Sequence, residues 1–417
     1  MRRMLLGCAM AALLAPGARA AECRTTIGVV MSLTGPAGPY GQAGAKSVEM
    51  AFHDLNAAGG VRGCTLTTDE RDAQSQGTVA VDGAKQLVEI GHVPAIIGGI
   101  ISSVSIPILT AVTAPAHVVQ VSPASSSPTL TELGRQGKTN GIFFRTITSD
   151  ALQGVAAARY ALDVGLKKLS VIHVNNDFGV NMEREFATAY KALGGTIVSD
   201  TPYNEKAASY DAEVTAAMAG GPDGLYLISY PVDGATITRA WISKGGPRRF
   251  LLNDGMNSGD YIAAVGAKYL EDAYGTSSGT EDSPSTAYFN GAYKAFSGLD
   301  PGSPAAVQAY DAGALVGLAI AAGGADSAGI RAGLYAVTDP AGEEVTAGPD
   351  GFRKALALLG EGKKIRYVGV IGPIRFDQYG DITGPFRLWQ IKGGQVVTKG
   401  TLTTADVDRI KAQIGAK

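Results

Sequence analysis

Residues 96–128 contain two apolar runs, and each run ends in a turn rich in hydroxyl groups. The first run reads Ile96-Ile97-Gly98-Gly99-Ile100-Ile101-Ser102-Ser103, and the second reads Val118-Val119-Gln120-Val121-Ser122-Pro123-Ala124-Ser125-Ser126-Ser127-Pro128. A buried strand that stops at such a turn and leads into a helix leaves backbone N–H groups without partners at its tip. Two tips of this kind, side by side, would form a cup for a small anion.

The residues around this stretch repeat the alternation of strand and helix. Apolar runs predict strands at 25–31, 64–70, 94–98 and 117–121, and amphipathic patterns predict helices at 42–58, 75–90 and 103–113. This order indicates an α/β lobe whose parallel sheet is covered by helices on both faces. Because ligands bind at the carboxyl ends of strands in such sheets, Tyr40, Ser102 and residues 124–126 should share one rim.

The alternation restarts after residue 150 and predicts a second lobe. Strands are expected at 169–174, 196–199, 224–229 and 250–252, and helices at 151–163, 210–218 and 234–243, with one more that ends at Leu193. Phe178, Tyr230 and Asp254 follow three of these strands and form a second rim. Further helices are expected at 284–296 and 305–322, and late strands at 366–373 and 387–394, with a hairpin-like turn at 377–381 between them.

The chain is therefore predicted to fold into two doubly wound parallel-sheet lobes of the α/β class. A length of 417 residues fits two domains, and a hydrophobic content of 45% with 18% charged residues fits well-formed cores. Short joining segments are expected near 145–148, 274–279 and 372–375. Lobe 1 then comprises 21–147 plus 279–372, and lobe 2 comprises 148–278 plus 373–417. The net charge of −2 gives no basic field for nucleic acid.

The N-terminal residues 1–20 have the order of a signal peptide. Arg2 and Arg3 form a basic end, residues 4–14 form an apolar core, and Ala18-Arg19-Ala20 fits an A-x-A cleavage site. The apolar run is too short to span a bilayer as a stable helix. We therefore expect cleavage near Ala20 and a soluble, exported mature protein.

Cleavage would remove Cys8 and leave Cys23 and Cys64, an even number in an oxidising compartment. Each cysteine precedes one of the first two expected strands, so both would lie at the same end of the sheet if those strands are parallel neighbours. The alternatives are a disulfide, which we predict, and two separate buried thiols. Two cysteines without a nearby histidine do not make a zinc site.

Enzyme chemistry has little support in the sequence. Gly275-Thr276-Ser277-Ser278-Gly279 matches the nucleophile elbow G-x-S-x-G, but no histidine follows His173, so the required order of serine, acid and histidine fails. The other interpretation of this motif is a glycine-rich hinge. The four histidines do not pair at the spacing of metal ligands. We predict a protein that is not an enzyme and uses no metal and no cofactor.

The two rims together fit an α-amino acid. The Ser102 hydroxyl and the N–H groups of the following helix point at one spot, where a carboxylate would gain hydrogen bonds and the positive end of a helix. Ser126 offers another hydroxyl and N–H group, and Ala124 offers a carbonyl acceptor. Asp254 on the facing rim would bind an ammonium group, since a buried carboxylate needs a partner. The alternatives are ordinary helix capping by Ser102, and turn formation by residues 125–127 and by Asp254.

A set of motifs in the same order resembles the periplasmic leucine/isoleucine/valine-binding proteins of ABC transporters, which have the type I periplasmic binding fold. The motifs are Ile27-Gly28-Val29, Leu33-Thr34-Gly35-Pro36, Tyr40-Gly41, Asp54-Leu55-Asn56, Gly59-Gly60-Val61, Asp69, Asp72, Ile97-Gly98-Gly99, Ser102-Ser103, Pro107, the turn from Ser122 to Pro128, Asp177-Phe178-Gly179 and Gly384-Pro385. The resemblance covers nearly the whole mature chain. It implies two lobes joined by a three-segment hinge.

The resemblance also implies roles for single residues. The family's carboxylate contact falls on Ser102, its turn falls on Ala124, Ser125 and Ser126, its lobe-closing aromatics fall on Phe178 and Tyr230, and its ammonium-binding acid falls on Asp254. Tyr40, Phe178 and Tyr230 would line the space for the ligand's side chain. Phe178 lacks the hydroxyl usual at its position, and Asp254 is shorter than the usual glutamate.

The sequence thus predicts a monomeric periplasmic solute-binding protein. It would bind an amino acid of the branched-chain or aliphatic type between its lobes and deliver this small-molecule ligand to an ABC permease in the inner membrane. One alternative is a binder of aromatic carboxylic acids or amides, since relatives of the family also take these. Another is a periplasmic sensor that reports ligand occupancy to a receptor.

Overall fold

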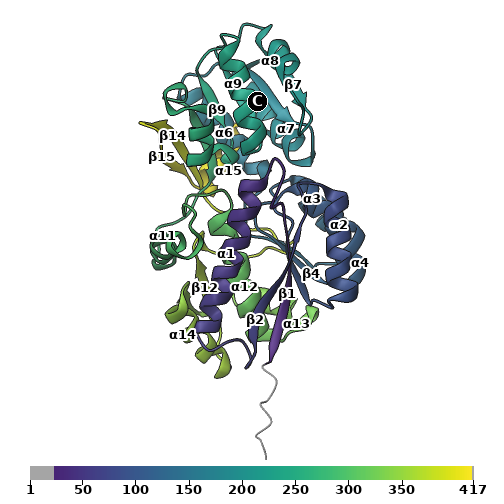
Figure 1. Ribbon diagram of the computed structural model, residues 1–417. Helices are drawn as coiled ribbons and strands as arrows, with labels where there is room; N and C mark the ends of the chain where they lie inside the picture. Colours follow the sequence, from purple (N-terminus) through teal and green to yellow (C-terminus); the bar gives the residue numbers. More distant parts are fainter. Residues whose placement is uncertain (1–22, 416–417) are drawn as a thin grey trace, which may run out of the picture.

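A computed structural model describes residues 23–415 and contains two α/β lobes, one above the other (Figure 1). The expected signal peptide at 1–20 lies outside the described residues. The sheet of the first lobe has the strand order β2-β1-β3-β4-β5, and every pair in it is parallel, as predicted. Its strands are β1 (Arg24–Met31), β2 (Thr65–Asp72), β3 (Ala95–Gly98), β4 (Val119–Ser122) and β5 (Phe143–Arg145).

Helices cover both faces of this sheet (Figure 1). One side carries α2 (Gly77–Lys85), the π-helical turn η1 (Gln86–Ile90), and the continuous helical segment of α3 (Ser102–Ile108), η2 (Leu109–Thr113) and α4 (Ala114–Ala116). The other side carries α1 (Gly38–Ala57), α11 (Pro284–Ser297), α12 (Ala306–Gly323), α13 (Ser327–Ala336) and α14 (Pro349–Gly360). The helix α5 (Pro128–Arg135) follows the second hydroxyl-rich turn.

One helix begins earlier than the sequence predicts, and another, α12, forms where it was expected. α1 begins at Gly38, earlier than the expected residue 42, because Pro39 occupies its first turn, where a backbone N–H is not needed. α12 is long and apolar enough to cross a membrane, but 78% of it is buried. It packs between α1 and α13, which explains why it is apolar on all sides.

The sheet of the second lobe has the order β15-β14-β10-β9-β8-β6-β7. The strands from β6 to β9 are parallel, as predicted, the unexpected strand β10 continues the parallel set, and β14 and β15 add an antiparallel edge. The bounds are β6 (Lys168–Val174), β7 (Thr196–Tyr203), β8 (Gly224–Ile228), β9 (Phe250–Leu252), β10 (Tyr274–Ser278), β14 (Phe386–Lys392) and β15 (Gln395–Leu402). Gly393 and Gly394 both have positive φ and form the two-residue turn of the β14–β15 hairpin.

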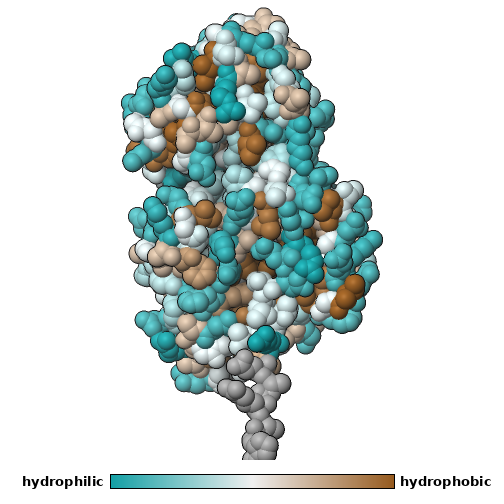
Figure 2. Space-filling view, in the orientation of Figure 1, coloured by the Kyte–Doolittle hydropathy of each residue, from teal (hydrophilic) through white to brown (hydrophobic). Residues whose placement is uncertain are grey.

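The second lobe is also covered on both faces (Figure 1). α6 (Asp150–Asp163), α7 (Asp177–Ala192) and α15 (Thr404–Gly415) pack together on one face, and α8 (Asp211–Met218), α9 (Pro231–Ser243) and α10 (Gly259–Val265) pack on the other. Short 3₁₀ turns occupy η3 (Asp254–Met256) and η4 (Ala267–Tyr269). The face of the molecule in Figure 2 is mostly hydrophilic, with apolar residues scattered over both lobes.

Two segments have a different structure from the one expected. Residues 275–279 are neither a nucleophile elbow nor a free hinge: 274–278 form the inner strand β10, and a loop separates it from α11. The single strand expected at 366–373 is split into β12 (Ile365–Gly369) and β13 (Gly372–Pro373), which form a small sheet with β11 (Glu343–Thr346). The split occurs because the buried Asp311 carboxylate accepts hydrogen bonds from the N–H groups of Val370 and Ile371, at 2.9 and 2.8 Å.

The chain passes between the lobes three times, between β5 and α6, between β10 and α11, and between β13 and β14. The passages are joined near one point: the Thr148 hydroxyl lies 2.7 Å from that of Ser278, and Thr148 forms a bridge with Ile382. This arrangement permits a hinge. The residue boundaries of the two moving units remain a prediction.

One glycine sets the position of the first hydroxyl-rich turn. Gly98 ends β3 with a φ of +143°, and a Cβ atom there would lie 2.2 Å from the carbonyl oxygen of Val30. Only glycine permits this close approach of β3 to β1. The chain can then turn at Gly99 and begin α3 at Ser102.

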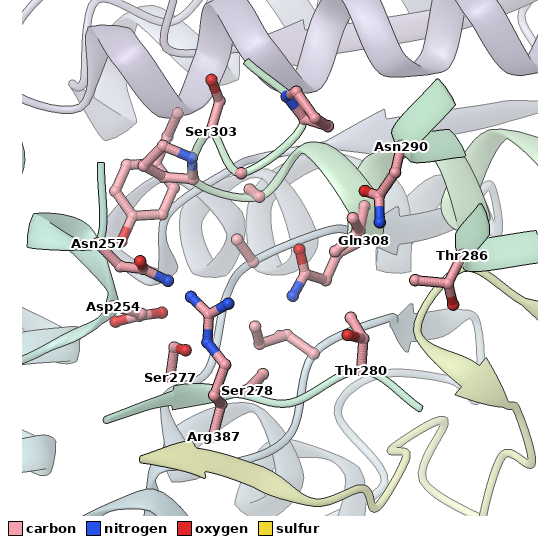
Figure 3. A pocket seen from close by; sticks show the side chains of 18 residues that line it. Asp254, Asn257, Ser277, Ser278, Thr280, Thr286, Asn290, Ser303, Gln308 and Arg387 are labelled. Atoms are coloured by element: carbon pink, nitrogen blue, oxygen red, sulfur yellow. The ribbon is translucent and has the colours of Figure 1, made fainter. Parts of the chain in front are cut away.

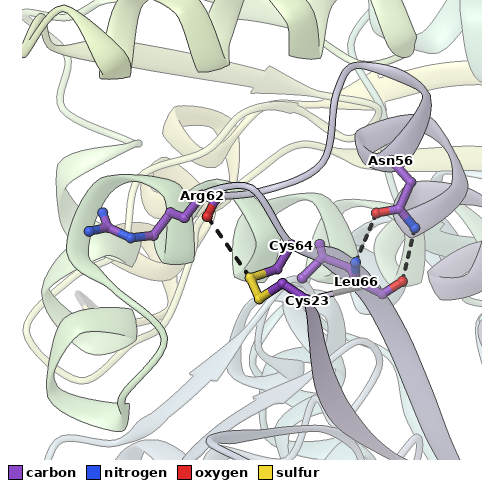
Figure 4. The surroundings of a disulfide bond; sticks show 5 residues. All are labelled: Cys23, Asn56, Arg62, Cys64 and Leu66. Atoms are coloured by element: carbon purple, nitrogen blue, oxygen red, sulfur yellow. Dashed lines mark hydrogen bonds between the residues drawn. A yellow bond between two sulfur atoms is a disulfide. The ribbon is translucent and has the colours of Figure 1, made fainter. Parts of the chain in front are cut away.

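A disulfide joins Cys23 and Cys64, with the two Cα atoms 4.5 Å apart (Figure 4). Of the two alternatives left by the sequence, the structure therefore contains the disulfide. The cysteines precede β1 and β2, whose parallel pairing begins at Arg24 and Thr65. The bridge closes a loop with a sequence separation of 41 and holds the edge strand β2 against β1.

Replacing either cysteine should destabilise the protein. We expect Cys23→Ser and Cys64→Ser each to lower the free energy of unfolding by about 2–4 kcal/mol, because the unfolded chain loses a long cross-linked loop. Urea denaturation under non-reducing conditions measures this. The double variant should match the single variants, since either replacement removes the same bond. An unfolding midpoint equal to that of the parent protein would contradict the expectation.

Candidate functional site

The two predicted rims face each other across a small cavity between the lobes. Its volume is about 10 Å³, which is room for about one water molecule. The lining contains every predicted ligand-binding residue except Ser125, and adds Ile101: Tyr40, Ile101, Ser102, Ala124, Ser126, Phe178, Tyr230 and Asp254. Sequence reasoning therefore brought together residues that are up to 214 positions apart, since Tyr40 and Asp254 line the same space.

The first-lobe wall of this cavity presents hydrogen-bond donors. Within the described chain, the backbone N–H groups of Ser102, Ser103 and Ser126 have no acceptor. The Ser102 hydroxyl oxygen accepts a hydrogen bond from the N–H of Ser127 at 3.1 Å, so its own proton is available for a ligand. The helix that begins at Ser102 adds the positive end of its dipole. This wall fits a carboxylate.

Ser125 has a different place from its neighbours. Its hydroxyl lies 2.7 Å from that of Ser105, and its backbone N–H donates to the Ser122 hydroxyl at 3.2 Å. Ser105 and Ser122 both donate to the carbonyl oxygen of Gly99, at 2.8 and 2.7 Å. The Ser125 side chain thus lies behind the cavity wall, where it ties the two hydroxyl-rich turns together.

A buried arginine fixes the backbone of the second turn. The Arg145 side chain is fully buried and donates hydrogen bonds to the carbonyl oxygens of Ser125 and Ser127, both at 3.1 Å. Its Nε pairs with the Asp381 carboxylate at 2.7 Å, and another nitrogen donates to Thr131 at 2.8 Å. Because the guanidinium binds these carbonyls from one side, the N–H of Ser126 between them is left to face the cavity.

A buried carboxylate lies directly behind Ser126. The Ser126 hydroxyl donates to Asp150 at 3.0 Å, and the Asp150 backbone N–H donates to the Ser126 carbonyl at 2.9 Å. The other Asp150 carboxylate oxygen, Oδ1, is buried and has no hydrogen-bond partner. Asp150 is the first residue of α6, so this clasp links the cup to the start of the second lobe.

The second-lobe wall carries the facing carboxylate and two aromatic rings. Asn253 is fully buried and holds Asp254 through a 3.1 Å hydrogen bond, while its own carbonyl oxygen accepts the N–H of Ser229. The rings of Phe178 and Tyr230 are stacked with centroids 5.7 Å apart. The Tyr230 hydroxyl accepts a hydrogen bond from Asn176, the residue that caps α7.

The acidic groups around this cavity have raised pKa values. Burial raises the pKa of Asp254. Burial, and then the negative charge of Asp254, raise the pKa of Asp150 well above its ordinary value, and the same two causes raise the pKa of the Tyr40 hydroxyl. No lysine or arginine lines the small cavity. A cationic group placed between Asp150 and Asp254 would stabilise both carboxylates.

The lobes already touch around this site. The Asn181 side chain of α7 donates to the hydroxyls of Ser127 and Thr129, at 3.1 and 3.2 Å. The Tyr40 ring meets the Tyr230 ring edge-on, with centroids 6.4 Å apart. These contacts explain why so little empty space remains between the two rims. A ligand could enter only if the lobes moved apart.

A larger cavity of about 170 Å³ adjoins the small one and shares Tyr40, Ala124 and Asp254 with it (Figure 3). It extends to the passages between the lobes, where Ser277, Ser278 and Thr280 follow or end β10. Arg387 of β14 and Gln308 of α12 also line it. The two cavities are therefore neighbours between the lobes.

Sequence reasoning missed several residues of the site, namely Arg145, Asp150, Asn176, Asn181, Asn253 and Arg387. Asp150 follows Ser149 and had the appearance of an ordinary residue at a helix start. Arg387 carried a weak signal, because it is a cation between apolar residues near the start of its strand. Within residues 23–415, no three His, Cys, Asp or Glu side chains gather in a way that could hold a metal ion.

A known protein family matches most of the chain. A model of the family named periplasmic binding protein matches residues 24–395. The chain belongs to the periplasmic binding protein family. This family membership agrees with the resemblance that the motifs indicated.

Three proteins illustrate which known proteins this chain is similar to. The Leu/Ile/Val-binding protein homolog 3 of Brucella melitensis is 28% identical over 250 residues, which are 60% of this chain and 66%, just under two thirds, of that relative. The crystal structure of the leucine-binding protein LivK from Thermotoga maritima has a TM-score of 0.77 at 23% identity and covers 92% of this chain and 99% of its own. A solute-binding protein from R. palustris in complex with benzoate has a TM-score of 0.74 at 18% identity and covers 91% and 96%. These two structural matches establish the type I periplasmic binding fold.

Arg145→Met should destabilise the protein by about 3–5 kcal/mol, because it removes the cationic partner of the largely buried Asp381 carboxylate and the hydrogen bond to the Ser125 carbonyl. Urea denaturation of the ligand-free protein measures this. Arg135→Met is a matched control, since Arg135 is exposed on the nearby helix α5, and should change stability by about 0.5 kcal/mol or less. Equal unfolding midpoints for Arg145→Met and the parent would show that the contacts of Arg145 do not stabilise the fold.

Proposed function

We propose that this protein is the periplasmic solute-binding component of an ABC importer and binds an amino acid between its lobes. One observation carries the proposal: unpaired N–H and hydroxyl donors on one wall face the Asp254 carboxylate on the other, and the cavity between them has no lysine or arginine of its own. An α-carboxylate and an α-ammonium group, held on one carbon atom, supply the two missing partners.

The site residues take the following roles in this proposal. The N–H groups of Ser102 and Ser103, the Ser102 hydroxyl and the N–H of Ser126 bind the ligand carboxylate. Asp254 binds the ammonium, and Asp150 holds the Ser126 hydroxyl from behind the opposite wall. Tyr40, Phe178 and Tyr230 enclose the start of the ligand's side chain. The names of the relatives point to leucine, isoleucine and valine as the first amino acids to test.

Closure of the hinge gives the mechanism. Each ligand group contacts a different lobe, so the ligand favours the closed state, in which both walls are complete. We propose that the closed form is what a permease in the inner membrane recognises, and that the protein acts as a monomer without covalent chemistry. Export to the periplasm would follow cleavage of the signal peptide near Ala20.

A binder of aromatic carboxylic acids is the second candidate. It is favoured by the stacked Phe178 and Tyr230 rings, because Phe178 offers an unbroken apolar face where the family usually has a tyrosine. The R. palustris protein in complex with benzoate also supports this second candidate. An aromatic acid has no ammonium group, so this function would leave Asp254 without a partner.

Asp254→Asn should weaken the binding of an amino acid by about tenfold or more, because it removes one charge-assisted hydrogen bond. Isothermal titration calorimetry with L-leucine, L-isoleucine and L-valine measures this. Asp260→Asn, at an exposed position in the next helix, is the matched control and should bind like the parent. Unchanged affinity in Asp254→Asn would exclude the ammonium role.

Amino-acid affinity should fall on acidification. Protons compete with the ammonium for the Asp254 carboxylate, and burial raises the pKa of this group, so the loss should begin at a higher pH than for an exposed aspartate. Calorimetry between pH 8 and pH 4, in steps of about one unit, follows the change. Asp254→Asn should flatten the profile, with Asp150→Asn as a separate test of the neighbouring acid. An affinity that rises on acidification would contradict the model.

A thermal-shift screen separates the two candidate ligands. A ligand that binds only the folded state raises the melting temperature, and the shift grows with its concentration relative to Kd. We expect shifts from aliphatic amino acids but none from benzoate or 4-hydroxybenzoate. Shifts from benzoate or 4-hydroxybenzoate but none from aliphatic amino acids would favour the aromatic-acid function, provided that Asp254→Asn shows the same shifts.

A further inference from the structure

The larger cavity contains an arginine without a partner. Arg387 faces Ser277 across the antiparallel pair of β14 and β10, and its side chain enters the cavity (Figure 3). Its Nε is buried and makes no hydrogen bond. Within residues 23–415, no carboxylate oxygen lies within 4.0 Å of its nitrogen atoms. The guanidinium therefore has no counterion in the protein.

This state is unusual for a largely buried cation. Arg145, the other arginine of the site, is paired with Asp381 and three further oxygens. Burial lowers the pKa of Arg387, and no neighbouring acid opposes this effect. Taking a charge out of water without a partner destabilises the folded state. A bound anion would remove that penalty.

The surroundings of Arg387 also fit an anion. Asp254 is the single charged side chain besides Arg387 in the lining of this cavity. The uncharged polar groups of the lining are amides and hydroxyls, such as Gln308, Asn257 and Ser277 (Figure 3). Gln308 is buried, and within the described chain its side-chain amide makes no hydrogen bond, so it has N–H donors to offer.

The cavity adjoins the proposed amino-acid site and has enough room for a side chain. Both spaces share Tyr40, Ala124 and Asp254, so a ligand with its α-groups in the cup can extend its side chain toward Arg387. The volume of about 170 Å³ is comparable to that of an engineered cavity of about 150 Å³ that takes up benzene.

We propose that Arg387 binds a second anionic group of the ligand, so that the site accepts amino acids with a carboxylate-bearing side chain. The planar guanidinium can hold that carboxylate through two parallel hydrogen bonds, and Gln308 can add a third. This inference rests on the proposed function, because the side chain reaches Arg387 only when the α-groups occupy the cup.

Calorimetry with L-glutamate and L-2-aminoadipate, each compared with L-glutamine and L-norleucine as uncharged counterparts, tests the proposal. Arg387→Met should weaken binding of the acidic ligands by about tenfold or more and leave the uncharged ones within about twofold. Arg387→Lys should have an intermediate effect, since it keeps the charge and loses the planar fork. Arg248→Met, at an exposed arginine of the second lobe, is the matched control and should change neither class.

Three results would overturn the proposal: no binding of either acidic ligand at millimolar concentration, unchanged acidic binding in Arg387→Met, or an equal loss for acidic and uncharged ligands, which would assign Arg387 a structural role. The comparison of glutamate with glutamine on the parent protein needs no variant and holds even if Arg387→Met does not fold. Uncharged amino acids that bind through Asp254 while acidic ones do not would refute this inference alone. Failure of every amino acid, with no effect of Asp254→Asn, would refute the proposed function as well.

Discussion

The site depends on the buried ion pair between Arg145 and Asp381. Arg145 stands at the first passage between the lobes, and Asp381 stands at the third, 236 positions later. The same guanidinium binds the carbonyls of Ser125 and Ser127 and so orients the turn that forms half of the cup. One interaction therefore joins two of the passages between the lobes to the wall that carries the unpaired N–H groups. A change in the position of either lobe acts directly on this wall.

The hydrogen bonds around this pair divide the cleft into a donor side and an acceptor side. Carbonyl oxygens of the first lobe are turned inward, onto Arg145 and onto the Ser105 and Ser122 hydroxyls, which leaves N–H groups at the surface of the cup. The second lobe contributes Asp254, and Asp150 adds a carboxylate oxygen without a partner. Under the proposed function, this division favours a ligand with an ammonium and a carboxylate group on one carbon atom, because such a ligand satisfies both walls at once.

The periodicity of the sequence was sufficient to predict both lobes and the rims that face each other, because buried parallel strands and their terminal turns are local features. Three kinds of feature could not be predicted in this way. The pairing of Arg145 with Asp381 needs contacts across the whole chain. The strands β5 and β15 were missed because the first has three residues and the second alternates exposed polar groups. No local rule states which of the successive serines 125–127 directs its side chain away from the cavity. In the structure it is Ser125, whose hydroxyl lies against that of Ser105.

Unpaired groups in the cleft explain how closure can be coupled to ligand identity. With the lobes in contact, the Nε of Arg387 and one oxygen of Asp150 are buried without partners, and both are unfavourable in a medium of low polarity. Opening would return these groups to water, so the empty protein gains little from remaining closed. A ligand that supplies the missing partners removes the penalty in the closed state alone, and only this difference between the states can shift the equilibrium. The groups that recognise the ligand are thus the same groups that make the empty closed form less stable.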